Sequence, residues 1–265
     1  MNEYVEAIIL GIVQGITEFI PVSSDGHLEL AKWLLGDSNT AADSLFMTII
    51  LHFGTAFAIV WVLRHVLVDV IKNLKTAEGR KFIGLIIISM IPAVVVGVGF
   101  LPLVESLFNQ QVVLVGLFLC INGVVLIVSD YLPNADKPIT PVKSFLIGIA
   151  QAIAILPGIS RSGSTIATSV ALGIDRQKAA QYSFIMVLPL LFGKMAKDIL
   201  DGRMEMEQSK ALPLILGFLI SFIVGVFAFK WLLAIVKKAK LSYFGFYCIL
   251  IGIAAIILRL WVWTN

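Results

Sequence analysis

Charged residues are scarce in this 265-residue chain, in which Asp, Glu, Lys and Arg together make up 14% of the sequence. Soluble domains carry about 25% charged residues and are roughly 45–50% apolar. Here 59% of the residues are hydrophobic and the mean hydropathy is +0.97, which excludes a soluble domain and predicts an integral membrane protein. The formal net charge of +3 provides no extended basic surface, so we expect no nucleic-acid partner.

Cysteine and histidine, the usual ligands of transition metals, are also rare. Cys120 and Cys248 lie inside apolar runs without metal-ligand spacing, so both are expected to be buried thiols outside any disulfide framework. Among the three histidines, His52 lies in an apolar run and His65 lies in a basic segment. We expect both to be structural, with a place in the lining of the cavity as the alternative for His52, which leaves His27 as the main candidate functional histidine.

Long apolar runs, by contrast, are abundant. A membrane-spanning helix needs roughly 20 mainly apolar residues, and six segments meet this requirement. They are Ser44–Leu63, Phe82–Leu101, Val112–Ser129, Ala179–Met195, Leu212–Leu232 and Leu241–Trp263. The sequence therefore predicts an all-α polytopic membrane protein that forms a single integral membrane domain over residues 1–265.

Four shorter apolar segments form two pairs, and a loop rich in Pro, Gly and Ser interrupts each pair. Val5–Ile20 and Leu28–Leu35 flank the first loop, and Phe145–Leu156 and Ile166–Leu172 flank the second. Irregular backbone is tolerated at membrane depth only where protein or a water-filled cavity satisfies its polar groups. We therefore predict two re-entrant helix–loop–helix hairpins.

The two halves of the chain show signs of an internal duplication. A shift of 137 positions places Gly11, Gln14, Ser23 and Gly26 on Gly148, Gln151, Ser160 and Gly163. A shift of 139 positions places Ser44, Met47, Phe53 and Gly54 on Ser183, Met186, Phe192 and Gly193. Each half would hold one hairpin and three spans, and because three is odd the halves would have opposite orientations. This predicts an inverted-topology repeat, with repeat 1 at about 1–135 and repeat 2 at about 136–265.

Lysine and arginine in the loops predict the orientation. Arg64–Lys81 carries five of these residues and Lys237–Lys240 carries three, and both segments fall on the side that we predict to be cytoplasmic. Pro102–Gln110 has none, as expected of an outer loop. Asp198–Ala211 fits less well, because it is predicted to be outer and yet has two basic residues. Both termini are then predicted to lie on the outer side.

Ionisable and hydrogen-bonding side chains at membrane depth are costly and usually functional, and here they gather on the two hairpins. Gln14 and Glu18 are four residues apart and share a helix face, so they could hold a divalent cation or orient a water molecule. The structural alternative is that Glu18 pairs with Arg161. A serine beside an imidazole can form a nucleophile–base pair. The loop that follows Glu18 provides such groups in Ser23, Ser24, Asp25 and His27.

The second loop, Gly158–Thr165, holds a permanent positive charge at Arg161. The guanidinium group matches phosphate oxygens in a bidentate geometry, and a helix predicted from about Ile166 would point its positive end at the same place. Hydroxyl donors come from Ser160, Ser162 and Thr165. The loop predicts a site for a phosphate-like anion. Two interpretations of this membrane protein fit such a site: an enzyme acting on a phosphorylated lipid, or a transporter or flippase of a phosphorylated lipid or solute. The serine, histidine and acid of the first loop favour the enzyme.

The residues Gln14–His27, QGITEFIPVSSDGH, are similar to the first signature of the bacterial undecaprenyl-diphosphate phosphatases, also called bacitracin-resistance proteins. Leu156–Thr165, LPGISRSGST, resembles the second signature of that family. The resemblance implies removal of the terminal phosphate from a C55 polyprenyl diphosphate. The product, undecaprenyl phosphate, is recycled as the lipid carrier of peptidoglycan synthesis, and the activity gives resistance to bacitracin.

The resemblance also implies a magnesium or calcium ion, a location in the bacterial cytoplasmic (inner) membrane, and contact with the lipid substrate and membrane lipids. A homodimer remains open as an alternative to a monomer. The catalytic residues implied are Glu18, Ser24, His27 and Arg161. The substrate-binding residues implied are Ser23, Ser160, Arg161, Ser162 and Thr165, and the metal ligands implied are Glu18 and Gln14. We favour attack on phosphorus by Ser24 with His27 as its base, with attack by His27 or by water as the alternatives.

Overall fold

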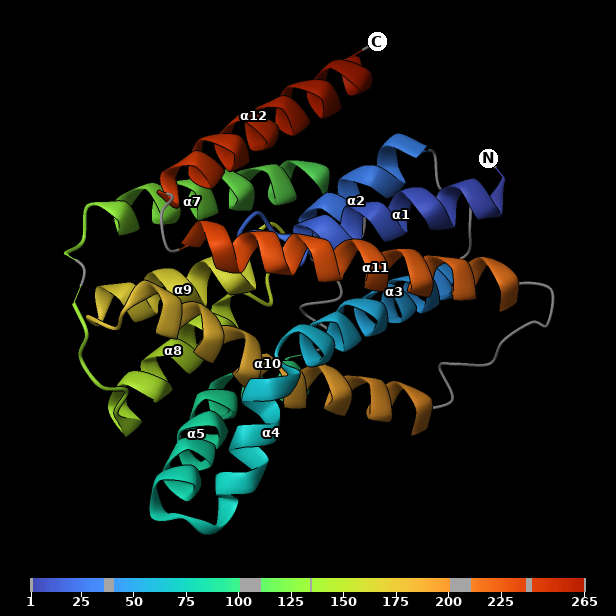
Figure 1. The fold of residues 1–265 in the computed structure, drawn as a ribbon. Helices are drawn as coiled ribbons and strands as arrows, with labels where there is room; N and C mark the ends of the chain where they lie inside the picture. Colours follow the sequence, from blue (N-terminus) through green and yellow to red (C-terminus); the bar gives the residue numbers. More distant parts are fainter. Residues whose placement is uncertain are drawn as a thin grey trace.

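The computed structural model describes residues 2–35, 41–100, 111–133, 135–200, 211–236 and 240–264, and within these ranges the chain forms helices and no strands (Figure 1). The predicted all-α class is confirmed. The predicted loop Pro102–Gln110, most of Asp198–Ala211 and most of the basic segment Lys237–Lys240 lie outside the described residues.

The helices have the following bounds in chain order. They are α1 (Glu3–Thr17), α2 (Ser24–Leu35), α3 (Ala41–Val62), α4 (Arg64–Lys72), the 3₁₀ turn η1 (Asn73–Lys75), α5 (Ala77–Gly99), α7 (Val112–Asp130), α8 (Pro141–Ile153), α9 (Arg161–Ala171), α10 (Arg176–Leu200), α11 (Ala211–Val236) and α12 (Ser242–Thr264).

Within the described ranges, five helices are long and apolar enough to cross a membrane: α5, α7, α10, α11 and α12. A sixth candidate span consists of α3 together with α4 and η1, which bend away from it by 69°. These elements agree with the six predicted spans. One prediction was wrong, since the basic segment after α3 begins with a helix and not with a loop. The α4 helix has Arg64 at its start and Lys72 at its end, and it exposes the apolar side chains of Val68 and Ile71 between them.

Four helices, α1, α2, α8 and α9, have 15, 12, 13 and 11 residues, fewer than the roughly 20 needed to cross a bilayer. They form the two predicted helix–loop–helix pairs. The second helix of each pair starts earlier than predicted, because a serine caps it: Gly26 N–H donates to Ser23 Oγ at 3.3 Å, and Gly163 N–H donates to Ser160 Oγ at 3.0 Å. The polar residues assigned to the two loops therefore lie in the first turns of α2 and α9.

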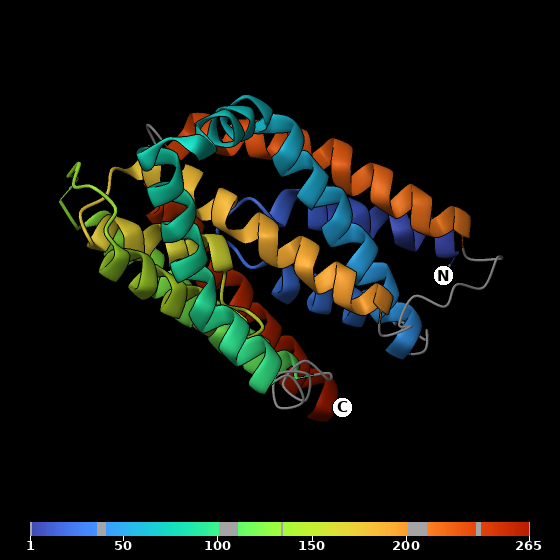
Figure 2. The same ribbon diagram turned by 90° about the horizontal axis from the view of Figure 1, so that it is seen from below.

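Helices of the first half of the chain pack against helices of the second half, and the pairing is reciprocal. The first helix of each hairpin packs on the second long helix of the other half, α1 on α11 and α8 on α5, and α7 packs along α12 (Figures 1 and 2). Such pairing is what an inverted repeat would produce, and the repeat itself stays a prediction. The start of α1 and the end of α12 both lie on the side of the bundle away from α4 (Figures 1 and 2).

The tips of the two hairpins meet at the centre of the bundle. Gly158 has a φ of +91°, and a Cβ atom there would overlap the carbonyl oxygen of Val115 on α7. A Cβ atom on Gly26 would lie 3.1 Å from Gly158 Cα. Glycine at these two positions lets the backbones of the two tips and α7 approach closely, and this meeting point positions the polar residues described below.

Candidate active site

The first hairpin supplies a buried carboxylate. Glu18 directly follows α1, and its side chain is 0% exposed. Its Oε2 atom accepts hydrogen bonds from Ser24 Oγ at 2.6 Å and from Gln14 Nε2 at 3.1 Å. A buried carboxylate is costly unless it is paired and hydrogen-bonded, so these donors stabilise its charge. The helical spacing of Gln14 and Glu18 and the early start of α2 at Ser24 bring the three side chains together.

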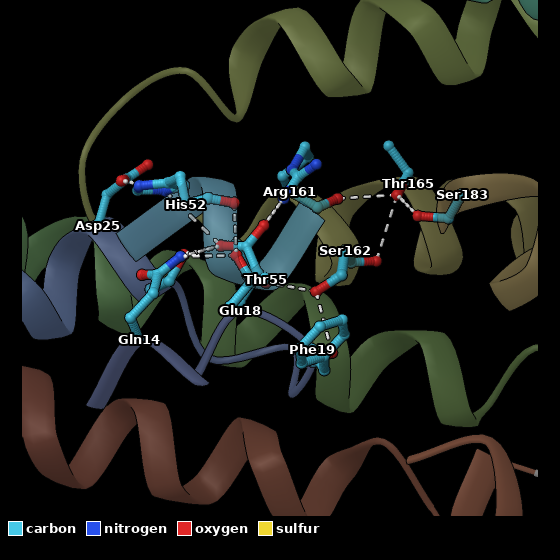
Figure 3. A network of polar contacts seen from close by, with 12 residues as sticks. Gln14, Glu18, Phe19, Asp25, His52, Thr55, Arg161, Ser162, Thr165 and Ser183 are labelled. Atoms are coloured by element: carbon cyan, nitrogen blue, oxygen red, sulfur yellow. Dashed lines mark hydrogen bonds and ion pairs between the residues drawn. The ribbon is translucent and has the colours of Figure 1, made fainter. Parts of the chain in front are cut away.

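The second hairpin supplies the countercharge. Arg161, the first residue of α9, forms an ion pair through Nη2 with Glu18 Oε1 (Figure 3). The Arg161 side chain is 22% exposed, and its Nη1 atom is buried without a hydrogen-bond partner among the described residues. The structural alternative, an ion pair with Glu18, is therefore present, but it does not use all the donors of the guanidinium group. A free N–H donor next to a buried carboxylate is suited to a bound anion.

His52 on α3, which was expected to be structural, lies in this cluster. Its Nε2 atom lies 3.3 Å from Asp25 Oδ1 and 3.7 Å from Glu18 Oε2, and its Nδ1 atom lies 2.9 Å from the carbonyl oxygen of Thr48 (Figure 3). Both ring nitrogens thus face oxygen acceptors. The sequence signal was weak, because a lone histidine inside an apolar span has no neighbouring polar pattern.

His27 does not pair with Ser24, which corrects the predicted nucleophile–base arrangement. Its Nδ1 atom lies 2.8 Å from the carbonyl oxygen of Ser23, and its Nε2 atom lies 3.0 Å from Tyr247 Oη on α12. The imidazole also stacks on the Tyr247 ring, with 5.6 Å between the ring centroids. The reason is that α2 already begins at Ser24. The first turn of this helix gives Ser24 and His27 different hydrogen-bond partners. Ser24 instead donates to Glu18.

The hydroxyl groups predicted to bind substrate are engaged within the protein. Ser160 Oγ caps α9 and lies 3.2 Å from Ser162 Oγ, which donates to the carbonyl oxygen of Phe19 at 3.4 Å. Thr165 Oγ1 lies 2.5 Å from Ser183 Oγ on α10 (Figure 3). Ser23 Oγ accepts from Gly26 N–H, with Ser23 at a φ of +71°. These bonds hold the tips in place, and a direct role of the four hydroxyls in substrate binding stays a prediction.

Asn122 on α7 joins the two tips, and sequence reasoning missed it. Its Nδ2 atom donates to the carbonyl oxygen of Pro21 at 3.1 Å, and its Oδ1 atom accepts from Ser160 N–H at 3.1 Å. The residue is 1% exposed. One amide therefore satisfies an acceptor of the first loop and a donor of the second, which fixes the position of Arg161 relative to Glu18. A lone asparagine in a long apolar span was the available signal.

The cluster has features of a cation site that is completed by a phosphate ligand. Gln14 Oε1 is buried without a hydrogen-bond partner among the described residues, and it stands beside Glu18. Magnesium and calcium prefer such oxygen ligands, and magnesium is commonly held by one or two carboxylates together with substrate phosphates. No group of three or more His, Cys, Asp or Glu side chains in the described chain could hold a metal alone. The residues therefore fit a cation whose coordination shell includes the substrate.

The loops of the two hairpins lie within the region that matches a known protein family. The family model described as bacitracin resistance protein BacA matches residues 7–254. The chain belongs to the BacA family. It is similar to curated proteins named undecaprenyl-diphosphatase, as the resemblance of the two hairpin sequences predicted.

Three relatives show how far this similarity extends across the BacA family. The undecaprenyl-diphosphatase of Christiangramia forsetii is 46% identical over 255 residues, which cover 95% of this chain and 97% of that protein. The protein of that name from Bacteroides thetaiotaomicron is 40% identical over 264 residues, covering 97% and 99%. The one from Methanobrevibacter smithii is 34% identical over 270 residues, covering 95% and 96%. The similarity thus spans nearly the whole chain.

Proposed function

We propose that this protein is a membrane phosphatase that hydrolyses undecaprenyl diphosphate to undecaprenyl phosphate and inorganic phosphate. The observation that carries the proposal is the meeting of Glu18 and Ser24 from one hairpin with Arg161 from the other in a single buried cluster. The cluster combines the Ser24 hydroxyl, which donates to the Glu18 carboxylate, with the Arg161 guanidinium group, which suits a phosphate group. BacA-family relatives named undecaprenyl-diphosphatase support the same substrate and reaction.

Ser24 is the nucleophile in the proposed reaction. Its oxygen attacks the terminal phosphorus and its proton passes to Glu18 Oε2, the carboxylate oxygen 2.6 Å away. The bond from the terminal phosphorus to the bridging oxygen breaks, and that oxygen leaves on undecaprenyl phosphate. Water then attacks the phosphoserine phosphorus, and the bond from that phosphorus to the Ser24 oxygen breaks. Glu18 returns its proton to the Ser24 oxygen, and inorganic phosphate leaves with the oxygen and the protons of the water. Glu18 therefore takes the base role that the sequence had suggested for His27.

Arg161 stabilises the charge that builds on the transferred phosphoryl group. Phosphoryl transfer depends mainly on positioning and on charge stabilisation, and a fixed guanidinium in a partly buried site provides both. The Nη1 donor, which has no hydrogen-bond partner among the described residues, is the donor that would bind a phosphoryl oxygen, while Nη2 keeps the ion pair with Glu18. A magnesium or calcium ion held by Gln14 Oε1 and Glu18 would supply further neutralisation of the diphosphate oxygens.

The protein is a multi-pass membrane protein, and we infer that it acts in the bacterial cytoplasmic membrane with both termini on the outer side. The polyprenyl chain then lies between the spanning helices and among membrane lipids. Recycling of undecaprenyl phosphate supports peptidoglycan synthesis, and faster recycling gives resistance to bacitracin. Whether the working unit is a monomer or a homodimer is decided by the mass of the protein–detergent complex in solution.

The test of this function is phosphate release from undecaprenyl diphosphate by the purified protein in detergent, with magnesium or calcium present. We expect one phosphate per lipid and undecaprenyl phosphate as the other product. A transporter or flippase would move a phosphorylated lipid or solute across proteoliposomes without releasing phosphate. That outcome would overturn the proposal.

A further inference from the structure

The imidazole of His27 pairs with a tyrosine on α12 that the proposed reaction does not use. Its Nε2 atom lies 3.0 Å from Tyr247 Oη, and the two rings stack with 5.6 Å between their centroids and 9° between their planes. The Nδ1 atom lies 2.8 Å from the carbonyl oxygen of Ser23. Two hydrogen bonds and a ring contact therefore fix the imidazole, and they direct its Nε2 atom from α2 toward α12.

The hydrogen bonds of His27 define what the Tyr247 hydroxyl can do. A carbonyl oxygen only accepts, so Nδ1 carries a proton that it donates to Ser23. In a neutral ring Nε2 accepts from the Tyr247 O–H, whereas in a charged ring Nε2–H donates to Tyr247 Oη. The hydroxyl suits both states, and in the charged state its own O–H can donate to another acceptor, such as a phosphate oxygen.

The position of Tyr247 in α12 is close to the tip of the first hairpin. The next residue, Cys248, has its Sγ atom 3.9 Å from the carbonyl oxygen of Pro21 in the loop of that hairpin. His27 lies three residues after Ser24 in α2, so these two side chains are neighbours on one helix. A row of side chains, Ser24, His27 and Tyr247, thus leads from the proposed nucleophile to α12.

The α12 helix presents apolar side chains to the outside of the bundle around Tyr247. Phe246 and Leu250 are 62% and 67% exposed, and Tyr247 is 41% exposed. Because α12 is long and apolar enough to span the membrane, these exposed side chains face the hydrocarbon core. The Tyr247 hydroxyl therefore joins a lipid-facing surface to the row of polar side chains that begins at Ser24.

We propose that the Tyr247 hydroxyl binds the lipid-linked phosphate of the substrate, the phosphate that stays on undecaprenyl phosphate, and that His27 holds this hydroxyl in position. The proposal rests on the phosphatase function above. Ser24 attacks the terminal phosphate and Arg161 binds it, and the lipid-linked phosphate is joined to it through the bridging oxygen. The second phosphate therefore lies beside the first, on the side from which the polyprenyl chain reaches the lipid. Tyr247 provides a hydrogen-bond donor on the lipid-facing side of Ser24.

The test compares Tyr247→Phe, which keeps the ring and removes the hydroxyl, with Tyr243→Phe one turn earlier on α12. Two probes are titrated by calorimetry into the purified proteins in detergent: inorganic phosphate alone, and farnesyl phosphate in the presence of inorganic phosphate. Farnesyl phosphate carries a lipid-linked phosphate on a short isoprenoid chain. We expect Tyr247→Phe to raise the farnesyl phosphate Kd about tenfold and to change the inorganic phosphate Kd less than about threefold. Tyr243→Phe should match wild type with both probes.

Steady-state kinetics with undecaprenyl diphosphate provide a second measurement. Tyr247→Phe should raise KM about tenfold and change kcat less than about threefold, because the lost contact is to a phosphate that does not react. The positioning role of His27 is tested with His27→Phe and with the double variant. In the His27→Phe protein, loss of the Tyr247 hydroxyl should change the farnesyl phosphate Kd less than about twofold. A tenfold effect that persists without His27 would contradict this positioning role.

Equal farnesyl phosphate affinity in the Tyr247→Phe and Tyr243→Phe proteins would overturn the role of Tyr247. An equal loss of affinity for both probes would also overturn it, as would a wild-type protein that does not bind farnesyl phosphate. The two proposals fail in different ways. A wild-type protein that binds farnesyl phosphate through Tyr247 but releases no phosphate from undecaprenyl diphosphate contradicts the phosphatase function only. A wild-type protein that releases phosphate, with no change in KM or Kd on loss of the Tyr247 hydroxyl, contradicts this inference only.

Discussion

Glu18 and Arg161 form an ion pair across 143 positions of the sequence, and this pair joins the two hairpins. The same Glu18 carboxylate accepts a hydrogen bond from Ser24, so Glu18 positions the Arg161 guanidinium group and also orients the proposed nucleophile, Ser24. Removal of one partner of a buried pair leaves an uncompensated charge and typically costs about 3–5 kcal/mol. Variants at this pair therefore need a stability measurement alongside the activity measurement.

Ser24→Ala should lower turnover by about 10³-fold or more, because it removes the attacking oxygen. The neighbouring Ser23→Ala is the matched control. Ser23 Oγ caps α2, so its loss should cost about 1 kcal/mol of stability and reduce turnover far less. Phosphate release by the two purified variants gives the comparison, and mass spectrometry of a quenched wild-type reaction should detect phosphate on Ser24. Near-normal turnover of Ser24→Ala would leave attack by His27 or by water.

His52→Phe should reduce kcat/KM about 10- to 100-fold, because the imidazole no longer faces the Glu18 and Asp25 carboxylates. His52→Gln should retain more activity, since its amide N–H can still donate to an acceptor. His65→Phe on the exposed face of α4 is the control and should behave as wild type. If His52→Phe has wild-type kcat/KM, the contacts of this imidazole do not contribute to the reaction.

Gly158→Ala should be much more damaging than Gly173→Ala, although both glycines have a positive φ, of +91° and +80°. Either alanine pays about 1–2 kcal/mol for the left-handed backbone. At Gly158 the new Cβ atom also overlaps the Val115 carbonyl oxygen, whereas at Gly173 it lies 3.0 Å from the flexible Lys137 side chain. Thermal unfolding in detergent should show the larger loss for Gly158→Ala. Equal losses would mean that the hairpin tip does not pack against α7 as described.

Gln14→Glu should lower the magnesium or calcium concentration needed for half-maximal activity by about tenfold, because it places a second carboxylate beside Glu18. Gln14→Leu, which removes the free Oε1 acceptor, should raise that concentration. Titration of the metal-depleted protein with each cation measures both effects. An unchanged cation dependence in both variants would remove Gln14 from the proposed set of ligands.

The spans and the hairpins could be predicted from the sequence. The spans follow from the length of the apolar runs, and the hairpins follow from the Pro, Gly and Ser residues that interrupt shorter apolar runs. Glu18, Ser24 and Arg161, which the structure brings into contact, could be singled out from the sequence because charged and hydroxyl groups are rare in an apolar chain. The early starts of α2 and α9 were missed because the apolar pattern begins later than the serine caps at Ser23 and Ser160.

His52 and Asn122 could not be assigned because their partners are distant in the sequence. His52 reaches Glu18 and Asp25 only after α3 packs beside the first hairpin. Asn122 bonds to two loops that lie on either side of it in the chain. Ser24 pairs with Glu18 and not with His27 because both Ser24 and His27 lie in the first turn of α2, which sets the directions of their side chains. The sequence predicted a loop there, and residue spacing in a loop does not define side-chain directions.

The most direct test of the account compares Arg161→Ala with Arg176→Ala. Arg176 forms an ion pair with Asp130 at 2.8 Å, away from the cluster, and its side chain is about as exposed as that of Arg161, at 20% against 22%. Phosphate release from undecaprenyl diphosphate is measured for both variants at a temperature where both are folded. We expect Arg161→Ala to lose about 100-fold or more in kcat/KM and Arg176→Ala to lose less than about threefold. Equal activity of the two variants would contradict the role of Arg161 at the centre of the site.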